Sequence, residues 1–258
     1  MPRFVPHPSR RPALISGASS GIGAATASLL AAAGHPVALG ARRADKCEEL
    51  AETIRKDGGE AFVHPLDVRS DDSVRDFFAA STEALGDPEI VVSSAGDLGA
   101  ERIHELDSAT FAAQLQIHLV GAHRLVAAAV PGMVERRRGD IVFVSSDVVR
   151  APRTRMGAYV AAKNGVEGMA RAMQMELEGT GVRASVVRPG PTMTGMGMGW
   201  DAETTAEVLT EWVSWGLARH PYFLKPDNVA AAIAAVVQAP RGTHLTLVEV
   251  QPERAVEQ

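Results

Sequence analysis

The sequence contains one cysteine, Cys47, in a chain of 258 residues. A lone cysteine cannot form a disulfide within the chain, which excludes the small secreted folds that depend on disulfides. Cys47 falls in ADKCEELAETIRKDGG, a segment with the apolar spacing of an amphipathic helix, where we expect a structural thiol. The sequence therefore predicts a reducing, cytoplasmic environment.

An excess of basic residues is also missing, because 26 Lys and Arg stand against 31 Asp and Glu and give a net charge of −5. Such a chain repels nucleic acid and acidic membrane surfaces, so we expect neither as a partner. We expect that no apolar run is long enough to span a membrane, and residues 1–10 resemble a loose lead-in without the apolar core of a signal peptide. The eight histidines show no metal-ligand spacing, so no metal site is predicted.

What the chain does have is an alternation of short apolar runs with longer segments of helical spacing. Several runs are continuously apolar, as in parallel strands covered on both faces. This alternation predicts a single α/β domain over 11–258, a Rossmann-type doubly wound sheet of about seven parallel strands with helices on both faces. The predicted strands are 12–16, 35–40, 60–65, 89–94, 140–146, 182–189 and 243–250. The predicted helices are 21–33, 44–57, 71–85, 108–130, 156–178 and 227–238.

Ligands of such a sheet bind at the carboxyl ends of the strands, so the residues after each strand are the functional candidates. After the first strand, SGASSGIG places Gly17, Gly21 and Gly23 at the start of a helix. Glycines there let backbone N–H groups approach a pyrophosphate at the helix N-terminus. After the second strand come Arg42 and Arg43, with no acidic residue at 40–43. Two arginines suit a ribose 2′-phosphate, which favours NADP(H), with NAD(H) as the alternative.

Aromatic residues are scarce at 5%, and one of the two tyrosines, Tyr159, stands four residues before Lys163 in GAYVAAKNGV. On a helix this spacing makes the two side chains neighbours. A tyrosine with its ordinary pKa of about 10 is a poor acid or base, and lowering it to about 7 requires roughly 4 kcal/mol. One cation about 4 Å away, at an effective dielectric of about 20, supplies energy of that order. The pair therefore has the chemistry of a proton donor, although most such pairs are surface neighbours.

Several motifs, in order and at matching spacings, resemble the short-chain dehydrogenase/reductase family over about 11–250: SGASSGIG, LDV, SSAG, VSS ending thirteen residues before Tyr159, YVAAK and RPGPTMT. The resemblance implies an NADP(H)-dependent oxidoreductase that interconverts a carbonyl and a secondary alcohol. It implies that Tyr159 is the general acid/base and that Ser146 bonds the substrate oxygen. Lys163 is implied to lower the tyrosine pKa and to hold the nicotinamide ribose. The cofactor-binding residues expected from the motifs are Gly17, Ser19, Ser20, Gly21, Ile22, Gly23, Arg42, Arg43, Asp67, Val68, Ser94, Ala95, Gly96, Tyr159, Lys163, Pro189, Gly190, Thr192 and Thr194.

Two departures from the family pattern concern the site. Ser94 replaces the usual asparagine after the fourth strand, which we expect to remove an amide that links neighbouring strands. His118 stands where the family has its fourth catalytic residue, an asparagine that holds a water in the proton relay. An imidazole with a pKa near 6.5 can also relay protons, so His118 is either catalytic or a packed helix residue. The alternative function is consequently a catalytically silent relative that binds dinucleotide and has a regulatory or scaffold role.

The segment 191–223 lies where the family places its substrate lid. Methionine and glycine alternate over 193–199, which predicts an adaptable apolar wall and a bulky apolar substrate. Trp200, Trp212 and Trp215 extend that wall, or else Trp212 and Trp215 form the buried stripe of a lid helix. Small and apolar residues on the 156–178 helix, with the family resemblance, predict a homodimer or homotetramer.

Overall fold

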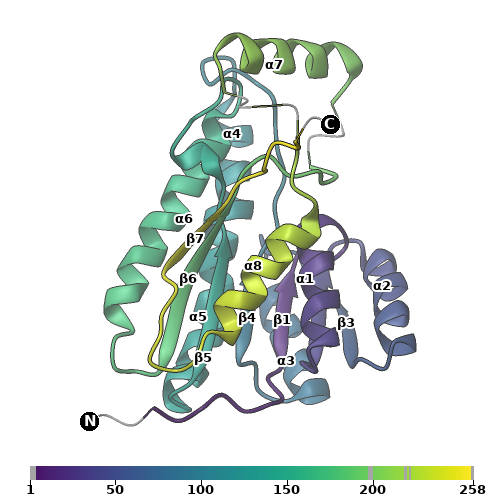
Figure 1. Ribbon diagram of the computed structural model, residues 1–258, viewed down its shortest axis with the longest axis vertical. Helices are drawn as coiled ribbons and strands as arrows, with labels where there is room; N and C mark the ends of the chain where they lie inside the picture. Colours follow the sequence, from purple (N-terminus) through teal and green to yellow (C-terminus); the bar gives the residue numbers. More distant parts are fainter. Residues whose placement is uncertain (1–3, 197–199, 218–219, 221, 257–258) are drawn as a thin grey trace.

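The computed structural model describes residues 4–196, 200–217, 220 and 222–256. Its sheet has seven parallel strands in the order β3-β2-β1-β4-β5-β6-β7 (Figure 1). The strands are β1 (Ala13–Ser16), β2 (Val37–Ala41), β3 (Ala61–Pro65), β4 (Ile90–Ser93), β5 (Gly139–Val144), β6 (Val182–Pro189) and β7 (Leu247–Val250). The helices are α1 (Gly21–Ala32), α2 (Ala44–Lys56), α3 (Asp71–Leu85), α4 (Ser108–Leu115), α5 (Gly121–Glu135), α6 (Gly157–Glu176), α7 (Ala202–Ser214) and α8 (Pro226–Gln238).

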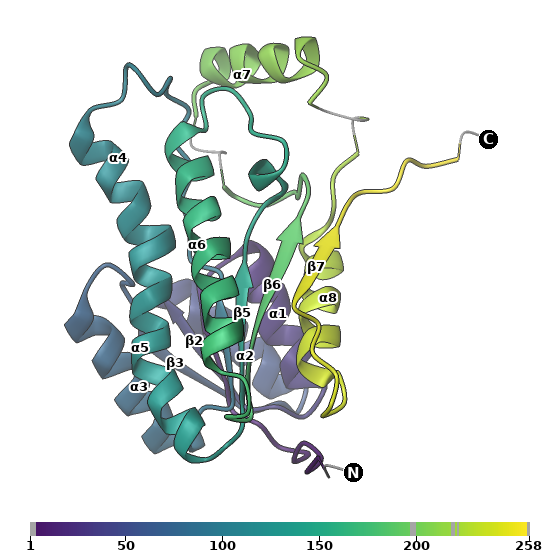
Figure 2. The ribbon, with the colours of Figure 1, turned by 90° about the vertical axis from the view of Figure 1, so that its left-hand side faces the viewer.

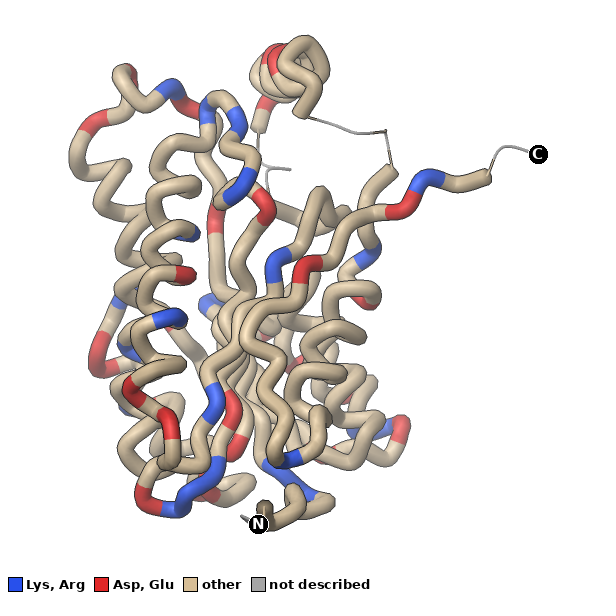
Figure 3. The backbone as a smooth tube through the Cα atoms, turned by 60° about the vertical axis from the view of Figure 1, so that its left-hand side comes forward, with Lys and Arg blue, Asp and Glu red and all other residues tan. Residues whose placement is uncertain are grey.

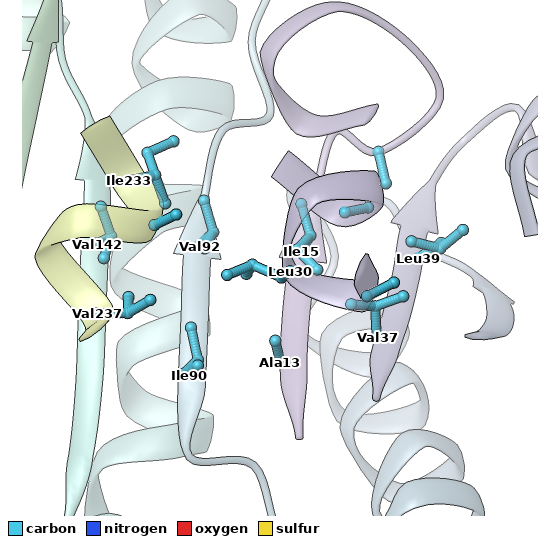
Figure 4. Close-up of a cluster of buried hydrophobic side chains, with 14 of the residues drawn as sticks. Ala13, Ile15, Leu30, Val37, Leu39, Ile90, Val92, Val142, Ile233 and Val237 are labelled. Carbon is cyan, nitrogen blue, oxygen red and sulfur yellow. The ribbon is translucent and has the colours of Figure 1, made fainter. Parts of the chain in front are cut away.

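Helices cover both faces of the sheet and produce three layers (Figure 2). On one face, α1, α2 and α8 pack against strand side chains; Figure 4 shows Ile15 and Val92 gathered near Leu30 of α1. On the other face, α3, α5 and α6 form a second core that includes Phe77 and Phe143. Burial on both faces explains why the strands are continuously apolar rather than alternating. The predicted doubly wound sheet of seven parallel strands is confirmed.

The strand order reverses between β1 and β4, since β2 and β3 lie on one side of β1 and the remaining strands on the other. The carboxyl ends of the strands at this point are where an open α/β sheet binds its ligands. Most predicted boundaries fall within two residues of the observed ones. The strand predicted over 243–250 is an exception, because β7 begins only at Leu247. A turn precedes it, in which Thr243 N donates a hydrogen bond to Pro240 O.

The helix predicted over 108–130 is interrupted and longer than expected. A π-helical turn, η1 (Gln116–Val120), separates α4 from α5 and contains His118. Such turns are frequent at functional sites. The segment Ser108–Glu135 is also long enough to cross a membrane and contains an apolar stretch with a mean hydropathy of 1.4, so the expectation that no run has that length was wrong. Its side chains Leu125 and Met133 pack in the second core, as in the core helix of a globular fold.

An ion-pair cluster lies at the amino ends of the strands, where basic and acidic positions occur together (Figure 3). Asp140 accepts hydrogen bonds from Arg11 and, at 2.6 Å, from Arg183 Nε. The Glu89 carboxylate lies 3.5 Å from Arg11 Nε and 2.9 Å from Arg138 Nε. Arg11, Glu89, Asp140 and Arg183 are all buried, so each charge depends on its partners.

The lead-in is attached more firmly than we expected. His7 Nε2 lies 3.0 Å from Arg183 Nη2 and 3.3 Å from Ala239 O, while Arg10 pairs with Glu60 at 3.0 Å. Residues 1–3 of the predicted lead-in lie outside the described residues. The ion-pair cluster therefore contacts the lead-in at His7, through Arg183, while Arg10 is paired outside the cluster.

α7 crosses the carboxyl end of the sheet within the predicted lid (Figure 1). Asp201 caps the helix, because its Oδ1 accepts from Thr204 N at 2.7 Å. Val208 is buried on α7, whereas Trp215, which follows it, is 72% exposed, so Trp212 and Trp215 do not form a buried stripe. Residues 197–199, 218–219 and 221 of the predicted lid lie outside the described residues.

Candidate active site

A cavity of about 940 Å³ lies between the carboxyl ends of the strands and α7. It is lined by residues that follow each of the first six strands, as the doubly wound topology predicts. Of the predicted site residues, those in its wall are Gly17, Ser19, Ser20, Gly21, Ile22, Gly23, Arg42, Arg43, Asp67, Val68, Ser94, Ala95, Gly96, Ser146, Tyr159, Lys163, Pro189, Gly190, Thr192 and Thr194. His118 lies behind the wall. In the described part of the chain, no three His, Cys, Asp or Glu side chains are grouped to hold a metal ion.

The loop after β1 depends on its glycines. Gly17 has a φ of +73°, and a Cβ at this residue would lie 2.8 Å from Ala95 Cα. A Cβ at Gly23 would lie 2.4 Å from the carbonyl oxygen of Gly17. The Ser20 side chain does not cap α1, which leaves the first N–H groups of the helix available to a ligand. A loop of this shape fits a pyrophosphate.

Two serines join the ends of β1 and β4 beside this loop. Ser16 Oγ accepts hydrogen bonds from the backbone N–H groups of Ser94 and Ala95 at 3.1 and 3.2 Å. In return, Ser94 Oγ donates to Ser16 O at 2.5 Å. The amide of the usual asparagine is missing, as expected, but the two strand ends are still linked, because the Ser16 and Ser94 hydroxyls form these hydrogen bonds.

The arginines after β2 lie beside the glycine-rich loop. Arg43 Nη2 donates to Ser19 Oγ at 3.1 Å and to Ser20 Oγ at 3.2 Å. Arg42 is exposed in the same wall of the cavity. The two guanidinium groups and two hydroxyls therefore present donors around one point of the cavity, an arrangement that suits a phosphate group.

Asp67, after β3, is held by a residue that sequence reasoning missed. Arg69 Nη2 donates to Asp67 Oδ2 at 2.6 Å and Arg69 Nε to Oδ1 at 2.9 Å. This hydrogen bonding from Arg69 lowers the pKa of Asp67 to about 2. Arg69 also lines the cavity, so the carboxylate enters it as part of an ion pair. In the sequence, the one signal for this ion pair is that an arginine stands two residues after Asp67.

Tyr159, Lys163 and Ser146 meet at the end of β5. The Tyr159 side chain is hydrogen-bonded to Ser146. Lys163 Nζ donates to Val144 O at 2.7 Å and lies 5.5 Å from the centre of the Tyr159 ring. All three side chains are buried, with residue exposures of 8% for Tyr159 and Ser146 and 6% for Lys163. Helical spacing brings tyrosine and lysine together, and the sheet places the serine opposite them.

Burial dominates the ionisation of this group. It raises the pKa of Tyr159 to about 12, and the hydrogen bond to Ser146 and the charge of Arg153 oppose that rise. Burial also lowers the pKa of Lys163 to about 8, so the lysine is still mostly charged at pH 7 but loses its proton above pH 8. In this structure Arg153 is the cation whose charge lowers the pKa of Tyr159, and an effect of Lys163 on that pKa stays a prediction. A tyrosine with this pKa is protonated at neutral pH and can act as a donor.

His118 lies against Tyr159, with ring centres 5.0 Å apart and the planes at 82°. Its Nε2 lies 2.7 Å from Asp97 O and 3.3 Å from Asp97 N, so the backbone of Asp97 can bond to this nitrogen in either tautomer. No described group bonds to the buried Nδ1, which faces Gly96. Burial and the charge of Lys163 lower the pKa of His118 to about 3, so the argument from an ordinary imidazole pKa was wrong. The imidazole is neutral at physiological pH.

The part of the cavity below α7 is largely apolar. Trp200 and Trp212 line it as expected, whereas Trp215 is not among its lining residues. An ion pair that sequence reasoning missed, Asp147 with Arg153, interrupts this apolar wall. Neither residue belongs to a motif, and only the fold of the loop after β5 brings the two together.

The family model for short chain dehydrogenases matches residues 11–205. This chain belongs to that family. The short-chain dehydrogenase fold also appears in solved structures, among them an alcohol dehydrogenase from the archaeon Thermococcus sibiricus complexed with 5-hydroxy-NADP. That structure has a TM-score of 0.81 and 29% identity, and the match covers 95% of this chain and 100% of the other. A metagenomic short-chain oxidoreductase in complex with NADP has a TM-score of 0.79 and 27% identity, over 95% and 98% of the two chains.

Two curated relatives of this short-chain dehydrogenase differ in size. Glycine betaine reductase ATRR of Emericella nidulans is 33% identical over 95% of this chain, which spans only 19% of the fungal protein. The 2,3-dihydro-2,3-dihydroxybenzoate dehydrogenase of Bacillus subtilis is 30% identical over 91% of both chains. Family membership makes this protein an NAD(P)-dependent dehydrogenase or reductase, and its cavity is the candidate active site.

Proposed function

We propose that this short-chain dehydrogenase is an NADP(H)-dependent oxidoreductase that interconverts a carbonyl and a secondary alcohol, with Tyr159 as general acid/base. The observation that carries the proposal is the joint placement of Tyr159, Ser146 and Lys163 in the wall of the cavity that also contains the glycine-rich loop. Proton-transfer groups and a dinucleotide cradle are the two parts that such a reaction requires.

The cavity fits a nicotinamide dinucleotide. Gly17 has no side chain where the loop comes close to Ala95, which leaves room for a pyrophosphate. The uncapped start of α1 supplies N–H donors for it. Pro189, Gly190, Thr192 and Thr194 are proposed to hold the nicotinamide end, and Asp67 and Val68 the adenine. Bound there, the cofactor supplies or accepts the hydride.

The protein's own part is to move one proton and stabilise one oxygen. In reduction, negative charge develops on the carbonyl oxygen, and Ser146 Oγ and Tyr159 Oη donate hydrogen bonds to it as Tyr159 transfers its proton. In oxidation, the Tyr159 phenolate removes the alcohol proton. Lys163, held by Val144 O, is placed to bind the ribose hydroxyls of the cofactor and to stabilise the phenolate.

Preference for NADP(H) over NAD(H) is the finer part of this proposal. It is supported by Arg42 and Arg43 at the end of β2, and by the bonds from Arg43 to the Ser19 and Ser20 hydroxyls. Two structural relatives were solved with NADP or its 5-hydroxy derivative. The 2′-phosphate is the group that these donors would bind.

The substrate is proposed to have an apolar body. Leu98, Met156, Leu209, Trp200 and Trp212 surround the part of the cavity next to Tyr159. Relatives of this chain are named for reactions on glycine betaine and on 2,3-dihydro-2,3-dihydroxybenzoate, so the family match itself does not select a substrate.

The experiment that tests the proposal joins two measurements on the full chain. Turnover of aliphatic, aromatic and steroid ketones is followed by NADPH absorbance, and cofactor binding by calorimetry. We expect tight NADPH binding and reduction of at least one ketone. Cofactor binding without any turnover, in both reaction directions, would instead support a silent dinucleotide-binding relative.

That second function has one observation in its favour. His118 replaces the asparagine of the family's proton relay, and burial keeps its pKa near 3, so it cannot exchange charge at neutral pH. We propose that His118 is a positioning residue that packs edge-on against the Tyr159 ring and holds the Asp97 carbonyl. A His118→Asn variant that gains activity would show that the natural histidine impairs the relay.

The assembly is proposed to be a homodimer or homotetramer in a reducing, cytoplasmic compartment. Burial raises the pKa of Cys47 to about 11, which suits an inert structural thiol. Ala158, Ala162 and Met173 are buried within the fold, so they do not contribute to a contact surface as we first expected. Every residue of α4 is at least partly exposed, so this helix is available for a contact between subunits. Light scattering at micromolar concentration tests this, and a monomer would contradict it.

A further inference from the structure

Asp147 and Arg153 form a buried ion pair in the cavity wall, one residue beyond Ser146. Arg153 Nη1 donates to Asp147 Oδ1 at 2.8 Å and Nη2 donates to Oδ2 at 2.6 Å. The Arg153 side chain is 7% exposed and the Asp147 side chain 12% exposed, and both residues line the cavity. The proton transfer proposed above uses neither residue. A buried bidentate pair in an apolar wall is costly to place, so its position calls for a physical reason.

The guanidinium is held from a second side by the lid. Its Cζ lies 5.5 Å from the centre of the Trp212 ring on α7. Trp212 is itself fixed, because its Nε1 donates to Thr154 O at 3.3 Å. Two contacts of this kind leave the guanidinium little freedom to turn, so its remaining donors have a fixed direction.

Those remaining donors are available in the cavity. A guanidinium has five N–H groups, and the pair with Asp147 uses two of them. Among the residues that the structure describes, Asp147 is the one acceptor that bonds to Arg153. The Nε–H and the N–H beside it form a second edge, which can bind another oxygen in the same planar way.

The Arg153 guanidinium lies close to the reacting position. Ser146 Oγ is 3.4 Å from Asp147 Oδ1, the same oxygen that Arg153 Nη1 contacts at 2.8 Å. Ser146 Oγ and Arg153 Nη1 are therefore no farther apart than these two contacts laid end to end. A substrate oxygen on Ser146 and a second oxygen a few bonds away could be bound together.

The charge of the surroundings indicates which kind of oxygen. Asp147 already neutralises Arg153, so a substrate carboxylate there would bury a second negative charge without a new cation. An uncharged carbonyl oxygen accepts from the guanidinium edge without that penalty. Leu98, Met156 and Leu209 then surround the apolar remainder of the substrate.

We infer that Arg153 determines substrate specificity by donating to a second, uncharged carbonyl oxygen of the substrate, in a β-oxo ester or amide. The inference rests on the proposed function, because it assumes that Ser146 and Tyr159 hold the reacting ketone. Asp147 and Trp212 act as positioning residues that fix the guanidinium.

The test compares two ketones of equal length, ethyl benzoylacetate and hexanophenone, which differ in the second carbonyl. The ester is intrinsically the more reactive ketone, so the informative quantity is the ratio of the two kcat/KM values and its change between variants. Arg153→Gln and Arg153→Lys are compared with the wild type. Arg150→Gln is the matched control, because Arg150 is an exposed arginine of the same loop that pairs with Glu249 outside the cavity.

We expect the ratio to fall by about tenfold or more in both Arg153 variants, as for the loss of a charge-assisted hydrogen bond, and to stay unchanged in Arg150→Gln. An equal loss of activity on both ketones, or an unchanged ratio, would overturn the inference and leave Arg153 a structural residue. If Arg153→Gln does not fold, Arg153→Lys keeps the charge but not the planar edge, and it must show the same fall.

Two further measurements separate this inference from the proposed function. The dissociation constants of both ketones, from tryptophan fluorescence, give the ratio even if no ketone is turned over. A silent protein that still favours the ester would contradict the proposed function alone. Asp147→Asn removes the charge that neutralises Arg153. The affinity for the benzoylacetate anion should therefore rise by at least about tenfold relative to the affinity for its ethyl ester. No gain would contradict the charge argument.

Discussion

The ion-pair cluster at the amino ends of the strands and the Tyr159–Lys163 pair at the carboxyl ends are both buried, but their partners differ. At the amino ends, Asp140 is bonded by two guanidinium groups, those of Arg11 and Arg183. At the carboxyl ends, Tyr159 and Lys163 are equally buried but bond to a neutral hydroxyl and a backbone carbonyl. In the described part of the chain, Lys163 forms no ion pair within 4 Å.

This difference in partners distinguishes buried groups that affect stability from buried groups that can take part in chemistry. A buried charge with an opposite charge in contact contributes to holding the fold, and removing one partner is strongly destabilising. A buried titratable group without such a partner shifts its pKa instead, which is how the pKa of Tyr159 reaches about 12 and that of Lys163 about 8. Groups of the second kind, placed in a cavity, are the ones that mark an active site.

The sharpest test of this contrast is Tyr159→Phe, which removes the ionisable oxygen and keeps the ring in its packing with Val148 and Met156. We expect turnover to fall by roughly 10² to 10⁴, the contribution of general acid–base catalysis, with cofactor affinity and stability nearly unchanged. Steady-state kinetics and calorimetry measure these quantities. Tyr222→Phe, at the exposed second tyrosine, is the control. Near-normal turnover in Tyr159→Phe would end the assignment of Tyr159 as the general acid/base.

At the opposite end, Asp140→Asn keeps the shape of the side chain and removes its charge. It leaves Arg11 and Arg183 buried without their shared counter-charge, so the free energy of unfolding should fall by about 3–5 kcal/mol. Urea denaturation measures the fall, and turnover per folded molecule should not change. Asp72→Asn, in an exposed pair on α3, should alter stability by less than about 1 kcal/mol. Similar effects of the two substitutions would contradict the role of the cluster.

Lys163→Met tests whether the active-site lysine reduces stability. Burial holds its pKa at about 8, below the ordinary value of 10.5, so the charged form is disfavoured in the folded state. Below pH 8 the variant should therefore be more stable than the wild type by up to about 3 kcal/mol. The unfolded state binds more protons between pH 8 and 10.5, so the advantage should shrink across this window and vanish above it.

Denaturation curves of both proteins at several pH values give this difference. Lys56→Met, at an exposed lysine of α2, controls for the added methionine. Loss of stability in Lys163→Met at neutral pH would mean that the bond to Val144 O outweighs the burial of the charge.

The smallest expected effect concerns the rim of the cofactor site. Arg42→Ala removes one cation from the proposed 2′-phosphate position, so the preference for NADPH over NADH should fall by about ten- to a hundredfold. The preference should also weaken at high salt, because Arg42 is exposed. Calorimetric dissociation constants test both statements, with Arg75→Ala on α3 as the control. Equal affinities for the two cofactors in the wild type would refute the NADP(H) preference.

Much of the fold and of the site could be predicted, because both are local in the sequence. The bounds of α3 and β6 follow from apolar spacing and from the residues at their ends. The glycine-rich loop and the Tyr159–Lys163 pair are separated by many residues, yet each one has its own local signal. His118 was identified as a departure from the family pattern, but the π-helical turn around it has no such signal.

By itself, the sequence determined the seven parallel strands, the crevice at their carboxyl ends and the motif residues that line it, because short-range spacing encodes each of them. Tertiary structure alone decided the pairs that join distant segments: Ser16 with Ser94, Arg153 with Trp212, and Asp140 with Arg11. It also decided the pKa values, because desolvation depends on what the whole fold places around a group. A tyrosine and a lysine four residues apart are neighbours in any helix, but only this fold buries them both.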